Sequence, residues 1–329
     1  MSAHPKEDGA VLLTTLLIMS FMASLVVTIT GDVRYAVKRT VSVEDALQAA
    51  HYLDGAEAYA LTYIQETLSQ TDPTALNVLL QTPQDSVLPI DGGAITLSLT
   101  DGSNCLNPAG VTTDEAAQSR LTNLLTLLDV PNFEAQSIVF ALADWQDADN
   151  NVSPGGAEDA HYMLGTPAYR SADSSITTVT EMRAVRGMTP EIFARLAPWM
   201  CVKGNADTAL NINTFTESQA ALLSATFGPG LTANVGTSVL ADRPPGGWSS
   251  NQALLESGVL AAYNISEDAL ATLDTSPSAL RVDITIAYRG TQRRARLYAD
   301  LNGQLLSRER DEAVGAIIED PIEEDTDER

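Results

Sequence analysis

The sequence of 329 residues has few of the residue types that most enzymes use for catalysis. Its two cysteines are too few and too far apart for a zinc motif. The three histidines, His4, His51 and His161, form no Ser-His-Asp or Cys-His set for nucleophilic catalysis. We therefore predict that the protein is not an enzyme.

Basic residues are also scarce, with 19 Lys and Arg against 43 Asp and Glu and a formal net charge of -24. Such a chain repels the phosphates of nucleic acids and suits metal cations or basic partners. Two segments, "RAVRGMTPEIFARL" and "NINTFTESQAALL", resemble pieces of helix-hairpin-helix motifs that can hold DNA. The surrounding negative charge argues against that use, and we predict no nucleic-acid partner.

Proline is absent between Pro5 and Pro73, and residues 10–31 carry no charge. This uncharged run is about as long as one bilayer crossing. Apolar residues then recur at helical spacing through residues 32–72. One continuous helix is the simplest interpretation, with a transmembrane half over 10–31 and an amphipathic stem over 32–72. The alternative is a cleavable signal peptide with a weak cut site near residues 22–24.

Negative charge is concentrated in the loop "DWQDADNNVSPGGAEDAHY" at residues 144–162. Its spacing resembles that of an EF-hand calcium loop, but valine replaces the glycine of position 6, so the turn must differ. Hard oxygen ligands without cysteine favour Ca²⁺ over softer metals. The residues that fit positions 1, 3, 5, 7 and 12 are Asp147, Asp149, Asn151, Ser153 and Glu158.

Two neighbouring carboxylates, Asp144 and Asp159, are candidates to complete this site or to hold a second ion. We therefore predict one or two bound Ca²⁺ ions. Carboxylates this close repel one another, and a divalent cation converts that repulsion into binding. The alternative is an ordinary solvated acidic turn.

The remaining pattern predicts an α+β fold. Residues 70–89 are predicted to form a proline-marked connection. "GGAITLSLTDGSNCLN" alternates as a half-buried strand, and residues 113–203 have mainly helical patterns. Helices are predicted at residues 113–130, 132–145, 174–188, 189–200 and 214–227, and residues 243–257 predict a loop entering a helix. The helix at 189–200 has Thr189 as its cap and Pro190 in its first turn. The segment from "ALRVDITIAYRG" to "LLSRERD" predicts two or three strands joined by Arg-Gly and Asn-Gly turns.

Several motifs carry a resemblance to a known family. A short leader ends in Gly9, directly before the uncharged helix, as in type IV prepilin-like proteins. Thr14 stands where most such proteins have a glutamate, and the blocks "DWQDAD", "PGGAEDAHY", "TEMRAVRGMTPEIFARLAP" and "LNINT" follow in order. Together these features resemble the K-type minor pseudopilins of type II secretion, also called the general secretion pathway protein K family.

This resemblance implies a pilin-like long N-terminal helix packed on a small antiparallel sheet, with a large inserted α-helical domain that binds calcium. It further implies cleavage between Gly9 and Ala10 by prepilin peptidase. The acids of "KEDG" depart from the usual leader. Bacterial inner-membrane anchoring by a single pass, with the body in the periplasm, follows from the same resemblance. Partners would be I-type and J-type minor pseudopilins and other secretion components.

A periplasmic body implies oxidised thiols, so Cys105 and Cys201 are predicted to form a disulfide, the alternative being two buried free thiols. The expected function is that of a minor pseudopilin at the tip of the pseudopilus, acting in export of folded proteins across the outer membrane. The alternative is a membrane-anchored, calcium-dependent binding module without a filament role. The predicted division is a leader at 1–9, the helix at 10–72, an α/β core at 73–111 and 204–312, the inserted domain at 112–203 and a disordered acidic tail at 313–329.

Overall fold

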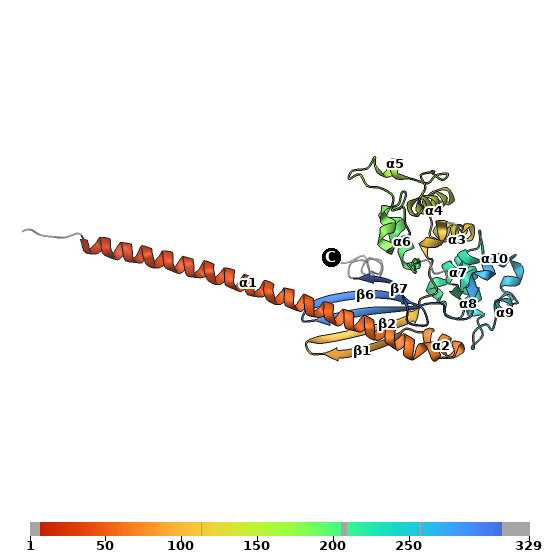
Figure 1. Cartoon of the computed structure of the whole chain (residues 1–329), viewed down its shortest axis with the longest axis horizontal. Helices are drawn as coiled ribbons and strands as arrows, with labels where there is room; N and C mark the ends of the chain where they lie inside the picture. The colour runs from red at the N-terminus through yellow and green to blue at the C-terminus, as the bar shows by residue number, and fades with distance from the viewer. Residues whose placement is uncertain (1–6, 113, 205–208, 257, 311–329) are drawn as a thin grey trace, which may run out of the picture.

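The computed structural model describes residues 7–112, 114–204, 209–256 and 258–310. Its most extended element is helix α1 (Glu7–Glu66), whose sixty residues span about 90 Å (Figure 1). The proline-free sequence allows this continuity, and the prediction of one long helix is confirmed. The first six residues of the predicted leader and the acidic tail lie outside the described residues.

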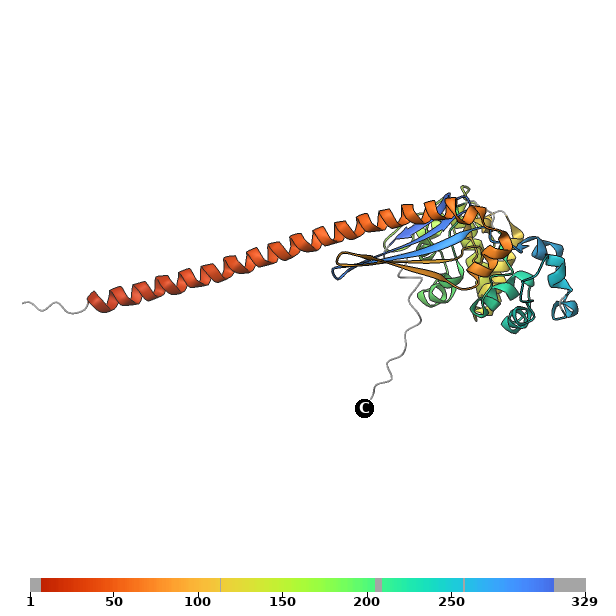
Figure 2. The same cartoon turned by 90° about the horizontal axis from the view of Figure 1, so that it is seen from below.

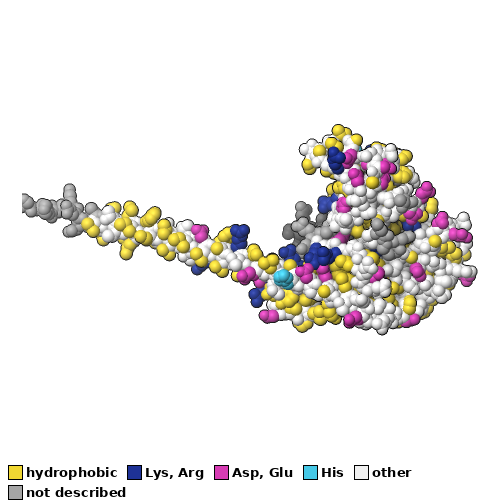
Figure 3. Space-filling model, in the orientation of Figure 1, with side chains coloured by type: hydrophobic (Ala, Val, Ile, Leu, Met, Phe, Trp, Pro, Cys, Tyr) yellow, Lys and Arg dark blue, Asp and Glu magenta, His cyan; other side chains and the backbone are white. Residues whose placement is uncertain are grey.

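The first half of α1 has no neighbours among the described residues, and every side chain from Val11 to Glu44 is exposed. Figure 3 shows this part of the helix covered with apolar side chains. Its hydroxyls are satisfied within the helix, as Thr28 donates to the Ser24 carbonyl at 3.0 Å and Thr30 to the Val26 carbonyl at 2.7 Å. Length and composition make this helix long and apolar enough to cross a membrane.

The second half of α1 packs on one face of a five-stranded antiparallel sheet (Figure 2). Alternate residues of the strands face the helix, as Val282, Ile284 and Ile286 show, and together with Leu53 and Ile64 of α1 they form a buried core. The strand order is β1-β2-β5-β6-β7, with bounds β1 (Gln84–Ile90), β2 (Gly93–Asp101), β5 (Leu280–Tyr288), β6 (Thr291–Ala299) and β7 (Leu305–Arg310).

The predicted terminal strands and their turns are confirmed. Arg289 and Gly290 both have positive φ, 46° and 82°, which is the geometry of a two-residue type I′ hairpin. The turn between β6 and β7 contains Gly303, whose φ is 76°. A side chain there would meet the Leu61 carbonyl of α1 at 2.6 Å, so glycine lets this turn pack against the helix.

Residues 70–89 were predicted as a proline-marked connection, and the structure corrects this to helix α2 (Pro73–Leu80) followed by strand β1. Helix α2 is short and begins with an Asp72 cap, whose side chain accepts from the Thr74 and Ala75 amides. Strand β1 is an edge strand with mostly exposed side chains. It therefore lacks the alternation of apolar residues that identifies a half-buried strand.

The inserted domain is built from short helices around its own core (Figure 1). The predicted helices α3, α4, α6, α7 and α9 are present, whereas residues 174–188 form only a 3₁₀ turn, η3 (Val179–Ala184), and helices α8 and α10 were not predicted. The helical bounds are α3 (Glu115–Leu127), α4 (Asn132–Gln146), α5 (Asp159–Tyr162), α6 (Pro190–Leu196), α7 (Ala220–Phe227), α8 (Ala233–Ala241), α9 (Asn251–Leu255) and α10 (Glu267–Ala271).

The helical domain is also larger than predicted. One continuous core runs from Leu106 to Leu273, so the prediction that residues 210–273 belong to the α/β core is wrong. Within this segment α7 packs on α3 and α8 packs on α7, and a short parallel pair joins β3 (Leu210–Asn211) to β4 (Leu273–Asp274). The chain thus leaves the sheet after β2 and returns to it at β5. The boundary was misplaced because the first helices cannot close a core alone.

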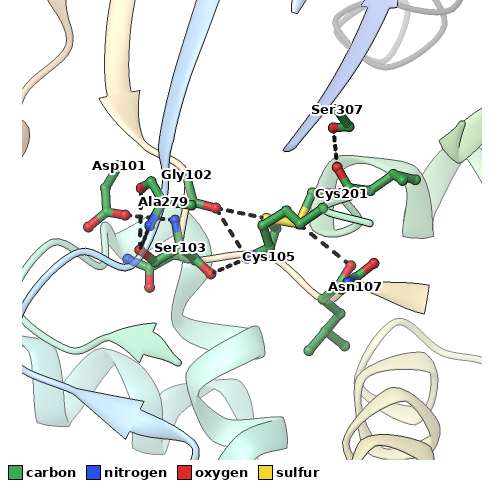
Figure 4. Close-up of a disulfide and its surroundings, with 12 residues drawn as sticks. Asp101, Gly102, Ser103, Cys105, Asn107, Cys201, Ala279 and Ser307 are labelled. Atoms are coloured by element: carbon green, nitrogen blue, oxygen red, sulfur yellow. Dashed lines mark hydrogen bonds between the residues drawn. A yellow bond between two sulfur atoms is a disulfide. The ribbon is translucent and has the colours of Figure 1, made fainter. Parts of the chain in front are cut away.

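The predicted disulfide between Cys105 and Cys201 is present at the junction of the two parts (Figure 4). Beside it, the Leu106 amide donates to the Trp199 carbonyl and the Cys201 amide donates to the Leu106 carbonyl. Because the helical domain continues to Leu273, the bond joins its start to its middle rather than to its end.

Candidate metal centre

The candidate site begins at the last turn of α4. This helix is apolar along most of its length because it crosses the centre of the helical domain, and it nevertheless carries Asp144 at 0% exposure. Asp147 caps the C-terminal end of α4, and the following loop returns to Glu158, the N-cap residue directly before α5. Two helix ends joined by one loop therefore bring the three carboxylates together.

One oxygen from each of Asp144, Asp147 and Glu158 lies within 4.8 Å of the other two. Glu158 is only 2% exposed. Within the part of the chain that the structure describes, Asp144 Oδ1 and both Glu158 oxygens are buried and accept no hydrogen bond from protein groups. Buried carboxylates without a donor are costly, and a cation is the group that this arrangement fits.

The same crowding changes the proton affinity of the site. The pKa of Glu158 is raised to about 7, first by burial and then by the charges of Asp144, Asp147, Asp149 and Asp173. Burial also raises the pKa of Asp147, an effect that the hydrogen bond from the Asp149 amide partly opposes. Both shifts reflect negative charge that is held out of water beside other carboxylates.

The backbone of the loop is shaped around Asp144. The Ser153 amide donates to Asp144 Oδ2 at 3.0 Å, and a side chain on Gly156 would lie 2.1 Å from that oxygen. Glycine at 156 is therefore required for the close approach. Arg186 donates to the carbonyls of Gly155 at 3.3 Å and Gly156 at 2.6 Å, which fixes the loop from the side of η3.

Aromatic side chains pack together beside the site. Trp145 and Tyr162 meet edge to face with ring centroids 5.1 Å apart, and Tyr169 packs against both. The Tyr162 hydroxyl accepts from the Arg186 amide, and burial raises the pKa of Tyr162 to about 12. The charges of Asp144 and Glu158 add to this rise, so Tyr162 lies close enough to the cluster to interact with its charge.

The other predicted ligands take different positions. Asp149 is exposed and accepts from the Asn151 amide at 2.7 Å, so it adds charge near the cluster without joining it. Asn151 is exposed, and the Ser153 carbonyl accepts from the Gly156 amide. Asp159 contacts Arg170 at 3.0 Å and accepts from the Ser171 amide and hydroxyl. The spacing argument therefore gave residues on the exposed side of the loop the same weight as the residues of the cluster.

The site offers three carboxylate oxygens and concentrated negative charge, which are the features that a cation site needs. Asp144 was predicted only as an accessory residue, although it is the most buried of the three. The signal for its role lay in the sequence. An aspartate in the final turn of a strongly apolar helix needs a partner, and the following Gly155-Gly156 pair permits close approach.

Comparison with known proteins identifies similar chains. Two family models described as "Type II secretion system (T2SS), protein K" match residues 96–205 and 210–276. The chain is 31% identical over 271 residues to type II secretion system protein K of Aeromonas hydrophila, covering 78% of this chain and 82% of that protein. It is also 31% identical over 265 residues to the protein of the same name from Pectobacterium carotovorum subsp. carotovorum, covering 78% and 81%.

A solved structure shares the fold. A chain from the crystal structure of the GspK–GspI–GspJ complex of the enterotoxigenic Escherichia coli type 2 secretion system aligns with a TM-score of 0.70 and 23% identity. The alignment covers 83% of this chain and 99% of that chain. The likeness therefore includes the helical domain as well as the sheet.

Proposed function

Since the chain belongs to the type II secretion system protein K family and is a minor pseudopilin, we propose that it occupies the tip of the pseudopilus. The observation that carries this proposal is the position of the helical domain. It lies at the end of the body far from the apolar half of α1 (Figures 1 and 2). A subunit stacked above would have to occupy the same space, whereas a subunit at the tip has nothing above it.

Thr14 supports the same position. In pilin-like filaments a glutamate at this place neutralises the terminal amine of a neighbouring subunit, and a tip subunit has no neighbour above to neutralise. An ionised glutamate buried there without a partner would cost several kcal/mol. The Thr14 hydroxyl instead donates to the Val11 carbonyl at 2.9 Å, within its own helix.

The proposed partners are the I-type and J-type minor pseudopilins, because the related solved structure is a complex of these proteins. The apolar half of α1 would anchor the chain in the bacterial inner membrane by a single pass, with the folded body in the periplasm. Prepilin peptidase would cleave between Gly9 and Ala10. N-terminal sequencing of the membrane-extracted protein should then begin at Ala10, and an intact Met1 or a start near Ser24 would exclude this processing.

The carboxylate cluster would bind Ca²⁺. Asp144, Asp147 and Glu158 would supply the core ligands, and a hard divalent ion suits their oxygen atoms. Its role would be structural, since it neutralises buried charge and fixes the loop to the end of α4. A solvated acidic turn fits less well, because Asp144 and Glu158 are buried.

Co-purification tests the function directly. The full chain in detergent should form a stable ternary complex with the I-type and J-type pseudopilins of the same system. The alternative, a membrane-anchored calcium-binding module without a filament role, predicts calcium binding but no such complex. A second arm with chelator shows whether complex formation needs the cation.

A further inference from the structure

Strand β7 is the last described element of the chain, and it contacts both the helical domain and the stem helix. Successive side chains of a strand point to opposite faces. Ser307 and Glu309 accordingly face the helical domain, and Arg308 and Arg310 face α1. A single short strand thus joins two parts of the molecule that have separate cores.

The contact with the helical domain is made by a buried glutamate. The Val179 amide of η3 donates to Glu309 Oε1 at 2.8 Å, and Glu309 is 2% exposed. Glu309 pairs across the sheet with Arg296, which in turn contacts Asp283 at 2.6 Å. The positive charge of Arg296 favours the ionised form of the Glu309 carboxylate, which faces the helical domain.

The contact with the stem is made by two arginines. Arg310 contacts Glu57 and Asp54 of α1, each at 2.6 Å, and Arg308 contacts Glu57 at 3.2 Å. The Glu57 side chain is largely buried, so these hydrogen bonds fix the rotation of α1 on the sheet.

The 3₁₀ turn that contains Val179 is also connected to the candidate metal centre by hydrogen bonds. Glu181, in the same 3₁₀ turn, accepts from the Trp145 indole at 3.1 Å and from the Thr177 amide at 3.0 Å. Trp145 is the residue after Asp144. The Trp145 carbonyl also accepts from the Ala172 and Asp173 amides, so segment 172–181 is attached to the end of α4 that carries the cluster.

We infer that Glu309 is a positioning residue through which cation binding at Asp144, Asp147 and Glu158 is coupled to the stem helix. This inference rests on the proposed Ca²⁺ site. Without the ion, repulsion among the carboxylates loosens the end of α4 and the segment attached to it. With the ion, that segment is fixed, η3 keeps its hydrogen bond to Glu309, and β7 holds α1 through its arginines. In a tip subunit, the orientation of the stem relative to the helical domain would then depend on calcium.

The test measures calcium affinity and hydrogen exchange in the full chain in detergent. In the native protein, Ca²⁺ should slow exchange of the α1 amides around Asp54 and Glu57 by about fivefold, near the lower limit of typical coupling between sites. Glu309→Ala removes the acceptor for Val179 and should abolish this slowing. Because coupling between two sites is reciprocal, Glu309→Ala should also raise the Kd for Ca²⁺ by about the same factor.

Three further variants separate coupling from simple loss of stability. Glu309→Gln keeps an acceptor oxygen and should restore both the affinity and the exchange response. Arg310→Ala breaks only the contact with α1 and should remove the exchange response while the helical domain remains folded. Glu217→Gln, at an exposed glutamate of the helical domain, is the matched control and should change neither readout.

Each contrary result has a separate meaning. If native protein binds Ca²⁺ but exchange in α1 does not change, the coupling is wrong and the metal site stands. If Glu309→Ala binds Ca²⁺ with native affinity and retains the exchange response, Glu309 has no positioning role. If native protein does not bind Ca²⁺, both the coupling and the proposed metal site are wrong.

Discussion

The two cores of this protein are stabilised in different ways. In the α/β part, long strands pair along their whole length and α1 covers one apolar face, so regular hydrogen bonding and burial hold the structure together. In the helical domain, helices of four to fifteen residues alternate with long loops. That domain carries the disulfide and the carboxylate cluster. The disulfide and the candidate ion site therefore lie where regular secondary structure is short.

Removal of the disulfide should reveal the difference in stability between the two cores most clearly. Replacing both Cys105 and Cys201 with alanine releases a loop of 96 residues, which in the chain-entropy model costs about 4–5 kcal/mol. We expect the helical domain to unfold at lower denaturant concentration while the sheet stays protected. Hydrogen exchange followed across a urea series measures this. Equal loss of protection in both parts would mean that they unfold as one unit.

Matched cavity mutations test the independence of the cores. Leu142 of α4 and Ile284 of β5 are both essentially unexposed, and truncating either to alanine should cost about 2–5 kcal/mol. Leu142→Ala should lower protection only in the helical domain. Ile284→Ala should destabilise the sheet and release the stem helix. The comparison fails if each variant affects the distant core as strongly as its own.

Removal of the proposed cation should weaken mainly the helical domain that contains its site. An ion that binds only the folded state adds about 2.7 kcal/mol at a hundredfold excess over its Kd. Chelation should therefore lower the Tm of that domain, and Ca²⁺ should restore it better than Mg²⁺, which dehydrates reluctantly. Glu158→Gln should remove most of this response, whereas Glu217→Gln should preserve it. Identical melting with and without chelator would show that the loop binds no ion.

The smallest expected effect is a pH dependence of the chelated protein. Burial and neighbouring carboxylates raise the pKa of Glu158 from 4.5 to about 7, so the folded state binds a proton more tightly than the unfolded state. The stability of the helical domain should therefore fall as pH rises from about 4.5 to about 7. Relaxation of the loop limits the size of this change. Urea unfolding at several pH values measures it.

Two comparisons sharpen the interpretation of that pH series. Saturating Ca²⁺ should flatten the profile, because the bound ion keeps the carboxylate ionised across the range. Glu158→Gln in chelator should flatten it as well, since the titrating group is gone. A profile that rises through this pH range in the chelated native protein would be inconsistent with a raised pKa.

Much of the fold could be predicted from the sequence because its strongest signals are local. The proline-free span, the alternation in β2 and β5, the Arg-Gly and Asn-Gly turns and the Thr189-Pro190 start of α6 each determine their own geometry. Strand β1 and helices α8 and α10 gave weaker signals. They are short or exposed and depend on their neighbours in the fold.

The candidate site was predicted less completely for the same reason. Spacing identified the loop and Glu158, but ligands on two helix ends depend on how those helices approach each other. The sequence assigned equal weight to Asp149, which is exposed, and to Asp147, which lies in the cluster. The domain boundary near residue 203 was wrong because helices α7 and α8 have no local feature that assigns them to one core or the other.

The position of the protein in the assembled filament tests the central claim most directly. Pseudopili sheared from cells can be imaged by electron microscopy with a gold-labelled antibody against the helical domain. We predict label at one end of each filament and none along the shaft. Label distributed at regular intervals along the shaft, or found only in the membrane fraction, would contradict a role at the tip.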